Sequence, residues 1–447
     1  MIIGVPSEVK NNENRVGLTP SSVKTIVESG HEVKIQSNAG ANIGFLDNQY
    51  INAGAKLVET AEALYASSEM IVKVKEPVPE EYKFLRNDLT LFAYLHLAGD
   101  PENAKKLIDT GVTGIAYETV TSEDGSMPLL APMSNIAGQL AVIVGSYHLL
   151  KPYKGKGVLI GHMQDMNPRV VTVIGAGVSG TQSIIKALDN NAFVKVVDSS
   201  QSKLDELKLQ FGSDNIEYIF STKDSIQSSI NESDLVIGSV YVVGKEAPKV
   251  ITKDMLSQMK PGTVMVDVSI DQGGCFETSK PTTHDNPIFL ENNIVHYCVT
   301  NMPGAVPLTA TLALNEATLP YIKDLCRKGI QKALDDDNHL FNGLNLRDGE
   351  VHELVFTLGG RGTDIYIDGT LVAHGSKSGS NYDWGNYQYI GQSADSGTFT
   401  GDILSYRAWD RELSASEAMD PSGLTSDHEF VFDANSFPDN VIDTGTD

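Results

Sequence analysis

The chain of 447 residues is too long for one hydrophobic core, because cores stop growing at about 250–300 residues, so two or three domains are expected. Its hydrophobic content of 41% is ordinary for a globular protein, and its formal net charge of −24 argues against nucleic acid as a partner. No run approaches the roughly 20 apolar residues of a membrane helix, and the first residues lack the basic and apolar stretches of a signal peptide. We therefore expect a cytoplasmic protein that has no membrane partner.

The number and spacing of the cysteines also favour a cytoplasmic protein. Cys275, Cys298 and Cys326 are an odd number, and their spacing matches no metal-binding pattern. The sequence therefore predicts neither a disulfide framework nor a metal site.

From residue 1 to about 345, apolar runs of strand length alternate with amphipathic helical stretches. Buried strands that alternate with helices predict βαβ units and mostly parallel sheets, and hence an α/β fold. The apolar, small-residue-rich stretch from Ser134 to Leu150 is typical of a long helix and would join two α/β lobes. The predicted buried strands cover residues 71–75, 91–97, 170–174, 192–197, 235–237 and 264–268.

Ionisable residues follow several of these strands, at the carboxyl ends where open α/β sheets place active sites. Lys75 closes one strand, strand alternation puts Tyr94 and His96 on one face of another, and Asp271 ends the strand 264–270. Taken singly, each has a structural alternative. Lys75 fits a solvated strand-end cation, His96 a hydrogen-bonded core histidine, and Asp271 a turn cap.

A glycine-rich segment follows the strand 170–174 and opens a helical pattern. Gly175, Gly177 and Gly180 form the spacing GxGxxG, with Val178 inside it. The motif alone is weak, but strand, glycines and helix together predict a turn that seats a pyrophosphate on the helix N-terminus. Asp198 ends the next strand, where its carboxylate would bind the ribose hydroxyls and repel a 2′-phosphate. The sequence therefore predicts NAD rather than NADP as cofactor; the alternative is a glycine-rich turn beside a solvated aspartate.

The chain changes character near residue 350. Residues 348–447 hold 18 acidic against 4 basic side chains, and both tryptophans, Trp384 and Trp409, lie there. Asp368-Gly369 between two apolar runs predicts a hairpin turn, and further short strands fit residues 387–391 and 401–407. We expect a β-rich tail attached to the α/β part.

Motifs from residue 1 to about 345 together resemble those of alanine dehydrogenase, in the family's order. They are Glu13-Asn14-Arg15-Val16, Lys73-Val74-Lys75-Glu76-Pro77, Tyr94-Leu95-His96-Leu97-Ala98, Pro132-Met133-Ser134, Asp271-Gln272-Gly273-Gly274, Pro281-Thr282-Thr283 and Asn301-Met302-Pro303-Gly304-Ala305-Val306-Pro307. The resemblance implies reversible oxidative deamination of L-alanine to pyruvate and ammonia, with hydride passing to NAD.

The resemblance also implies roles for individual residues. Arg15 would grip the substrate carboxylate, Lys75 would contact the carboxylate or the developing carbonyl oxygen, and Tyr94 would belong to the same substrate site. His96 would be the general acid/base, and Asp271 would orient the amine, imine or attacking water. Met133 and Ser134 would line the cleft, with Ser134 also on the cofactor side and Asn301 near the nicotinamide.

By the same resemblance, two Rossmann-like lobes are expected: a split substrate domain (1–130 and 305–348) and an NAD-binding domain (131–304), assembled as hexamers. Gln139 and Leu308 stand where basic residues are usual in the family, and residues 161–165 replace a more glycine- and valine-rich loop. The family's final helical segment is replaced here after Asn345. Losing it would expose apolar surface on the first domain.

The tail, residues 349–447, resembles a partial laminin-G or concanavalin-like jelly roll between Glu353 and about Ala418. Half a sandwich leaves an open sheet face that must pack elsewhere. Two other functions stay open: the NAD-binding subunit of a proton-translocating transhydrogenase, and an inactive scaffold that presents a lectin-like module. Lys75, His96 and the Asp271-Gln-Gly-Gly run favour the dehydrogenase.

Overall fold

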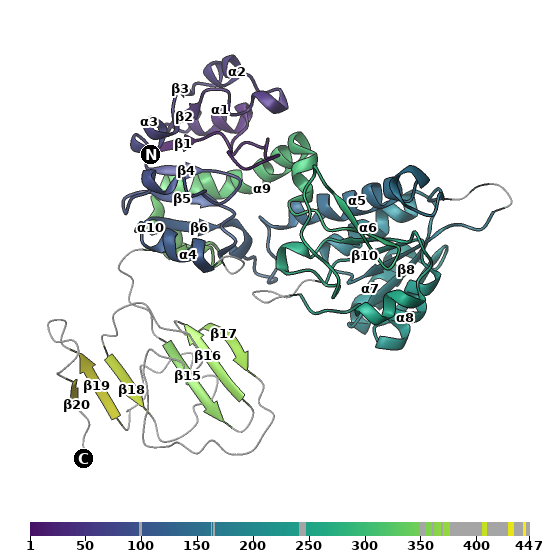
Figure 1. Cartoon of the computed structure of the whole chain (residues 1–447). Helices are drawn as coiled ribbons and strands as arrows, with labels where there is room; N and C mark the ends of the chain where they lie inside the picture. Colours follow the sequence, from purple (N-terminus) through teal and green to yellow (C-terminus); the bar gives the residue numbers. More distant parts are fainter. Residues whose placement is uncertain are drawn as a thin grey trace. The chain divides into compact units, whose positions relative to one another are not determined.

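The computed structural model describes residues 1–97, 101–161, 163, 166–240 and 247–347, and six strands between residues 354 and 443. The chain forms two compact units, Met1–Asp348 and Gly349–Asp447. The first unit contains two seven-stranded sheets, each in a lobe of its own (Figure 1). The expected pair of Rossmann-like α/β lobes is therefore confirmed.

The first lobe is built on a mostly parallel sheet. Its strands are β1 (Ile2–Val5), β2 (Glu32–Gln36), β3 (Lys56–Val58), β4 (Met70–Val72), β5 (Thr90–Ala93), β6 (Thr113–Ala116) and β14 (Leu344–Leu346). They lie in the order β14-β6-β5-β4-β1-β2-β3, and only β14 runs antiparallel to its neighbour. The order reverses between β1 and β4, where such a sheet leaves a crevice beyond its carboxyl ends.

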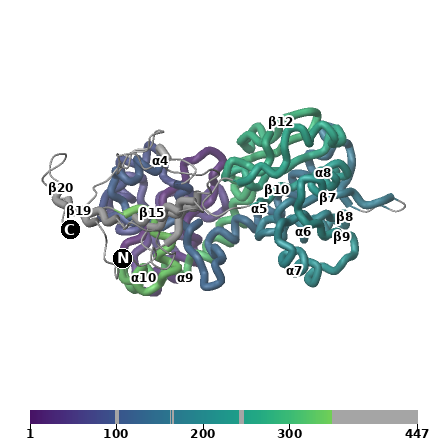
Figure 2. The backbone as a smooth tube through the Cα atoms, turned by 90° about the horizontal axis from the view of Figure 1, so that it is seen from below, coloured from purple at the N-terminus to yellow at the C-terminus, as the bar shows by residue number. Residues whose placement is uncertain are grey.

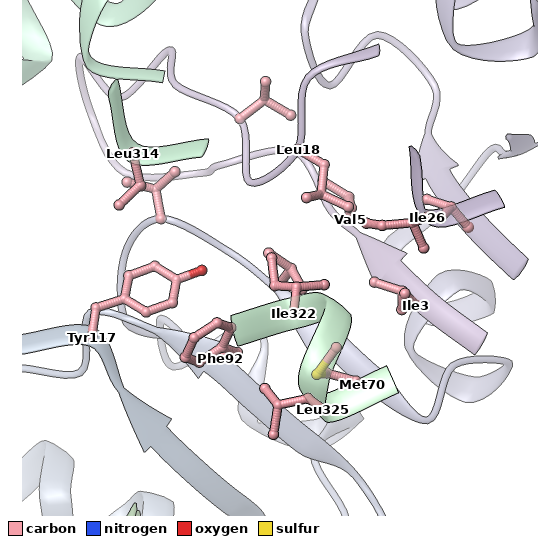
Figure 3. Packing of buried hydrophobic residues seen from close by; sticks show 14 of the residues in the cluster. Ile3, Val5, Leu18, Ile26, Met70, Phe92, Tyr117, Leu314, Ile322 and Leu325 are labelled. Atoms are coloured by element: carbon pink, nitrogen blue, oxygen red, sulfur yellow. The ribbon is translucent and has the colours of Figure 1, made fainter. Parts of the chain in front are cut away.

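Helices from both ends of the unit cover this sheet. They are α1 (Pro20–Glu28), α2 (Asp47–Asn52), α3 (Ala61–Ala66), α4 (Pro101–Ile108), α9 (Pro307–Lys328), α10 (Ile330–Asp336) and α11 (Asn338–Phe341). Thr19 caps α1 by accepting the Ser22 amide, and Pro20 opens it. Figure 3 shows Ile3 of β1, Phe92 of β5 and Leu325 of α9 around one core, so the chain returns to the first lobe after completing the second. Figure 2 shows the same return as green α9 and α10 among purple and blue segments.

The second lobe is also a doubly wound sheet. Its strands are β7 (Val170–Ile174), β8 (Phe193–Asp198), β9 (Ile216–Phe220), β10 (Leu235–Gly238), β11 (Val264–Asp267), β12 (Ile288–Glu291) and β13 (Ile294–Tyr297), and its helices are α6 (Val178–Asp189), α7 (Gln201–Phe211) and α8 (Lys223–Glu232). The strand order is β12-β13-β11-β10-β7-β8-β9, with only β12 antiparallel to its neighbour. The order reverses between β7 and β10, which places a second crevice there.

Helix α5 (Ala131–His148) connects the lobes and confirms the predicted long helix, which begins three residues before Ser134. Met133 near its start packs in the first-lobe core, whereas Ala137, Leu140 and Ala141 pack in the second-lobe core. At Gly138 a Cβ atom would lie 2.1 Å from the Ser179 carbonyl oxygen, so only glycine permits this contact with α6. In the described part of the chain, no helix is long and apolar enough to cross a membrane.

The second unit contains two antiparallel three-stranded sheets. One comprises β15 (Leu354–Gly359), β16 (Gly362–Ile367) and β17 (Thr370–Gly375), and the other β18 (Ser405–Ala408), β19 (His428–Phe432) and β20 (Val441–Asp443). Ile367 pairs with Thr370, which agrees with the predicted two-residue hairpin at Asp368-Gly369. The strand predicted at 387–391 lies outside the described residues.

Candidate active site

A cavity of about 430 Å³ lies at the carboxyl ends of both sheets of the first unit. It brings together Lys75 and His96 from the first lobe with Asp271 and Asn301 from the second. The cavity is further lined by Lys10, Asn11, Asn12, Glu76, Leu95, Asn103, Thr283, His284 and Thr300. Four residues predicted from separate parts of the sequence thus face one space.

The first-lobe wall is built across the crevice between β1 and β4. Glu8, just after β1, accepts the backbone amide of Val74 at 2.6 Å, which ties the two chain segments together. Lys10 pairs with Glu76 across the same gap. Burial alone would raise the pKa of Glu76, but electrostatic interactions with Lys75, His96 and Lys10 and the bond from Lys10 outweigh burial and lower that pKa. Glu76 therefore stays a carboxylate beside Lys75 and Lys10.

The strand expected over residues 71–75 ends earlier, at Val72. Lys73 is 1% exposed, and its ammonium lies 2.6 Å from a Glu81 oxygen and 3.8 Å from Glu8. A buried ammonium needs charged partners, and these two carboxylates supply them. Beyond Val72 the backbone still bonds to the neighbouring segment, since the Lys73 amide donates to the Phe92 carbonyl and the Val74 carbonyl accepts the Tyr94 amide. Lys75 follows on an irregular segment.

Tyr94 and His96 also lie beyond their strand, because β5 ends at Ala93. Their rings nevertheless stack, with centroids 5.8 Å apart. His96 has a φ of +50°, and its backbone amide donates to Glu118 at 2.5 Å. The Tyr94 hydroxyl donates to the Leu129 carbonyl at 2.6 Å. His96 reaches the cavity, whereas Tyr94 is buried beneath it and does not line it.

Arg15 is also buried, with 2% exposure, and its guanidinium is already engaged. Nε donates to Glu13 at 2.7 Å, Nη2 pairs with the same carboxylate and donates to Asn301 at 2.7 Å, and Nη1 points to the Met133 sulfur at 3.2 Å. Although burial opposes it, the bonds from Arg15 and Asn301 lower the pKa of Glu13. The two-pronged face expected to grip a substrate is therefore turned toward Glu13.

β11 ends at Asp267, earlier than the predicted end at Ile270. Asp271 therefore lies four residues beyond the strand, on the 3₁₀ turn Ile270–Gln272. Gly273 and Gly274 follow with φ of +83° and +77°, the left-handed conformation that favours glycine. The predicted Asp-Gln-Gly-Gly run is thus a tight loop that presents Asp271 to the cavity.

The glycine-rich turn follows β7 at the crevice between β7 and β10. A Cβ atom on Gly180 would lie 1.9 Å from the Gly175 carbonyl oxygen, and one on Gly175, whose φ is +92°, 2.6 Å from the Ser239 carbonyl oxygen. By contrast, open space surrounds the Cβ position of Gly177. Because Gly177 has no side chain, no side-chain cap occupies the first amides of α6, which suits an anionic pyrophosphate there.

The other predicted cofactor residues flank this turn. Asp198, at the end of β8, accepts the amides of Ala176 and Ser200, both at 2.7 Å. Val178 opens α6 and is 51% exposed. Ser134 lies in the first turn of α5, outside the cavity lining as the described residues define it.

Sequence reasoning missed Lys10, Glu76 and His284 as cavity residues. Glu76 directly follows Lys75, so the adjacent opposite charges were an available signal. Lys10 and His284 come from loops with no periodic pattern, and only the fold places them beside the other residues.

Two family models match the first unit almost completely. Residues 4–137 match the N-terminal domain of alanine dehydrogenase/PNT, and residues 141–353 match its C-terminal domain. The alanine dehydrogenase of Halomonas elongata is 50% identical over 351 residues, which are 78% of this chain and 94% of that protein. That of Bacillus subtilis is 46% identical, over 78% and 92%. The chain belongs to the alanine dehydrogenase family.

Solved structures agree. An L-alanine dehydrogenase matches with a TM-score of 0.75 and 46% identity, covering 78% of this chain and 96% of that one. A transhydrogenase from Sinorhizobium meliloti matches with a TM-score of 0.64 and 24% identity, over 73% and 96%, which shows the shared fold alone. Membership of this family, with Rossmann-like lobes, implies a nicotinamide cofactor.

The tail has a separate likeness. Residues 330–419 match the concanavalin A-like lectin/glucanases superfamily, which confirms the resemblance expected from the sequence. As for metals, the part of the chain that the structure describes holds no group of three His, Cys, Asp or Glu placed to bind an ion.

Proposed function

We propose that this chain catalyses the reversible, NAD-dependent oxidative deamination of L-alanine to pyruvate and ammonia. The observation that carries the proposal is the cavity in which Lys75, His96 and Asp271 meet at the carboxyl ends of both sheets. The relatives at 46–50% identity support the same reaction.

The side chains divide the chemistry between them. A nicotinamide cofactor bound in the second lobe would supply the hydride acceptor for the substrate Cα. Lys75 draws the substrate carboxylate or carbonyl oxygen to the first-lobe wall, and His96 takes and returns protons as amine becomes imine and then ketone. Asp271 on the opposite wall stabilises the cationic nitrogen and orients the attacking water.

Arg15 acts differently from a free two-pronged clamp. Its Nε and Nη2 are bonded to Glu13, so the available donor is Nη1, which now meets only the Met133 sulfur. Because a thioether is a weak acceptor, a substrate carboxylate can replace it. Met133 would then line the filled site, with Tyr94 supporting His96 from beneath.

The first test follows NADH absorbance with purified protein, L-alanine and NAD at alkaline pH, with NADP and D-alanine as controls. Activity restricted to L-alanine and NAD is expected. His96→Ala should abolish turnover and leave NADH binding nearly intact. Wild-type protein that binds NADH without turnover would favour an inactive scaffold instead, and near-normal turnover of the variant would remove His96 from the mechanism.

We assign the cofactor to the lobe formed by 131–304 and the substrate to 1–130 with 305–348. Gly175, Gly177, Val178 and Gly180 would seat the pyrophosphate, with Ser134 and Asn301 toward the nicotinamide. Gly177→Ala should fold normally but weaken NADH binding, because its Cβ enters the open space; Gly180→Ala should disturb folding, because its Cβ meets backbone. Equal effects of the two on melting temperature would contradict this assignment.

Asp198 would favour NAD over NADP by charge. Asp198→Asn should narrow the preference for NAD, as the ratio of kcat/KM values for the two cofactors would show. An unchanged ratio would assign the preference to other residues.

We also propose a homo-oligomer, a hexamer by resemblance. It is supported by exposed apolar side chains on α5 and the segment after it: Ile143, Tyr147, Tyr153, Leu159, Met163 and Met166. Light scattering of the full chain tests this proposal, and a monomer at micromolar concentration would end it.

A further inference from the structure

The loop that carries Asp271 is closed by one buried carboxylate, that of Asp267. Its Oδ1 accepts the Ser269 amide at 3.0 Å, at the start of the loop. Its Oδ2 accepts the Cys275 amide at 2.8 Å and the Phe276 amide at 3.3 Å, at the end of the loop. One side chain therefore fastens both ends of the segment that presents Asp271.

Asp267 has a further hydrogen-bond partner and is closely packed. The Ser279 hydroxyl donates to Oδ2 at 2.5 Å, and Asp267 itself is fully buried. A Cβ atom on Gly274 would lie 2.7 Å from the same oxygen. The Asp267 carboxylate thus packs against the left-handed glycine turn on its buried side, whereas Asp271 lies on the side of the loop that lines the cavity.

We propose that Asp267 is a positioning residue for Asp271, and that its amide bonds set the place of the Asp271 carboxylate in the cavity. The proposal rests on the proposed alanine dehydrogenase function. Asp267 lines no part of the cavity itself, so it acts only through the loop.

Asp267→Asn tests the proposal, because the amide keeps the size of the side chain but replaces one acceptor oxygen with a donor. We expect kcat for alanine oxidation to fall about 100-fold, the loss that follows a reacting group displaced by about 1 Å. NADH affinity should stay within about twofold. The deuterium isotope effect on hydride transfer from the alanine Cα should rise, because displacement of Asp271 slows the chemical step until that step limits the rate.

Asp234→Asn is the matched control. Asp234 is another buried carboxylate of the same sheet, bonded to Lys156 at 3.0 Å and to the Val170 amide at 3.3 Å, but at the amino ends of β7 and β10. This variant should lose stability without a comparable loss of kcat or change in isotope effect. A loss of kcat equal to that of Asp267→Asn would overturn the proposal.

Two further variants keep the test decisive if Asp267→Asn folds poorly. Ser279→Ala is the milder one: it removes one donor to Asp267 and should cost about 3- to 10-fold in kcat. Gly274→Ala disturbs the same contact from the loop side and should reproduce the kinetic pattern of Asp267→Asn. The positioning role of Asp267 would be refuted if the Asp267→Asn variant folded and kept the kcat of the wild type. It would also be refuted if all three variants lost kcat and NADH binding together. Absence of alanine turnover in the wild type would refute the proposed function instead.

Discussion

Ion pairs hold the cavity-lining segments of the first lobe, whereas the Asp271 loop of the second lobe is held by a carboxylate that accepts hydrogen bonds from uncharged donors. On the first side, the buried ammonium of Lys73 pairs with the buried carboxylates of Glu8 and Glu81. On the second side, Asp267 is surrounded by backbone amides and hydroxyls.

The difference shows two ways to fix a loop at the end of a parallel strand. A buried ion pair depends on both partners, and losing one leaves an uncompensated charge. A carboxylate bonded to amides divides its support among several donors, so the loss of a single donor costs less. The two walls should therefore respond differently to substitution.

The largest effect is expected for Lys73→Met, which leaves Glu8 and Glu81 without a cation. We expect a loss of about 3–5 kcal/mol in the free energy of unfolding, measured by urea denaturation. Lys75→Met, two residues later, is the control: it should abolish turnover with little change in stability. Equal losses of stability in the two variants would contradict the distinction between Lys73 as part of a buried ion-pair network and Lys75 as a cavity residue.

A second prediction concerns pH: the contributions of Glu13 in the first lobe and Asp267 in the second to the free energy of unfolding should change with pH in opposite directions. The pKa of Glu13 lies below its ordinary 4.5, so its stabilising contribution is full above pH 4.5 and is lost as pH falls through the folded pKa. Burial raises the pKa of Asp267 above its ordinary 3.8, although bonds from Ser279 and two backbone amides oppose it. Its contribution is therefore full below pH 3.8 and is lost as pH rises through the raised pKa.

It follows that Glu13→Gln should cost more at neutral than at acid pH, and Asp267→Asn more at acid than at neutral pH. Each cost is on the order of 1–3 kcal/mol, typical of hydrogen-bonded charges. Urea unfolding at about pH 4 and about pH 8 measures both. Parallel pH trends would show that the two carboxylates are held in the same way.

The smallest effect is expected outside the loop. Exposed Lys249 donates to the carbonyl oxygens of Gly273 and Gly274. Lys249→Met should lose no more than about 1 kcal/mol, since water can replace these bonds, and kcat should stay within about twofold. Lys253→Met, which breaks an exposed pair with Glu291, is the control. A large loss of kcat in Lys249→Met but not in Lys253→Met would show that Lys249, and not Asp267, fixes the conformation of the loop.

Much of the fold could be predicted because it is local. The strand over 170–174, the glycine turn and the helix α5 follow from periodicity and turn chemistry. The ends of strands could not be predicted in the same way. β4 ends at Val72, and the next residue, Lys73, pairs with Glu8 from a distant part of the sequence. Asp267 ends β11 because its partners come from the following loop.

The candidate site was predicted as a set of residues but not as an arrangement. Lys75, His96 and Asp271 face one cavity, as three separate strand-end signals suggested. The engagement of Arg15 by Glu13 was not predicted, although only one residue separates them, because sequence does not show which face of a guanidinium is occupied. Whether these residues act as proposed stays a prediction.

Helix α5 has a consequence for the distance between the two ends of the reaction. Met133 on this helix touches the Arg15 guanidinium, and Gly138 touches Ser179 at the start of α6. Gly138 lies five positions after Met133 along the helix, a rise of about 7.5 Å. A single helix therefore sets the distance between the proposed carboxylate-binding residue Arg15 and the proposed pyrophosphate-binding turn. An insertion of one residue there would lengthen this spacing by about 1.5 Å and rotate one end relative to the other by about 100°, which would misalign the two proposed sites.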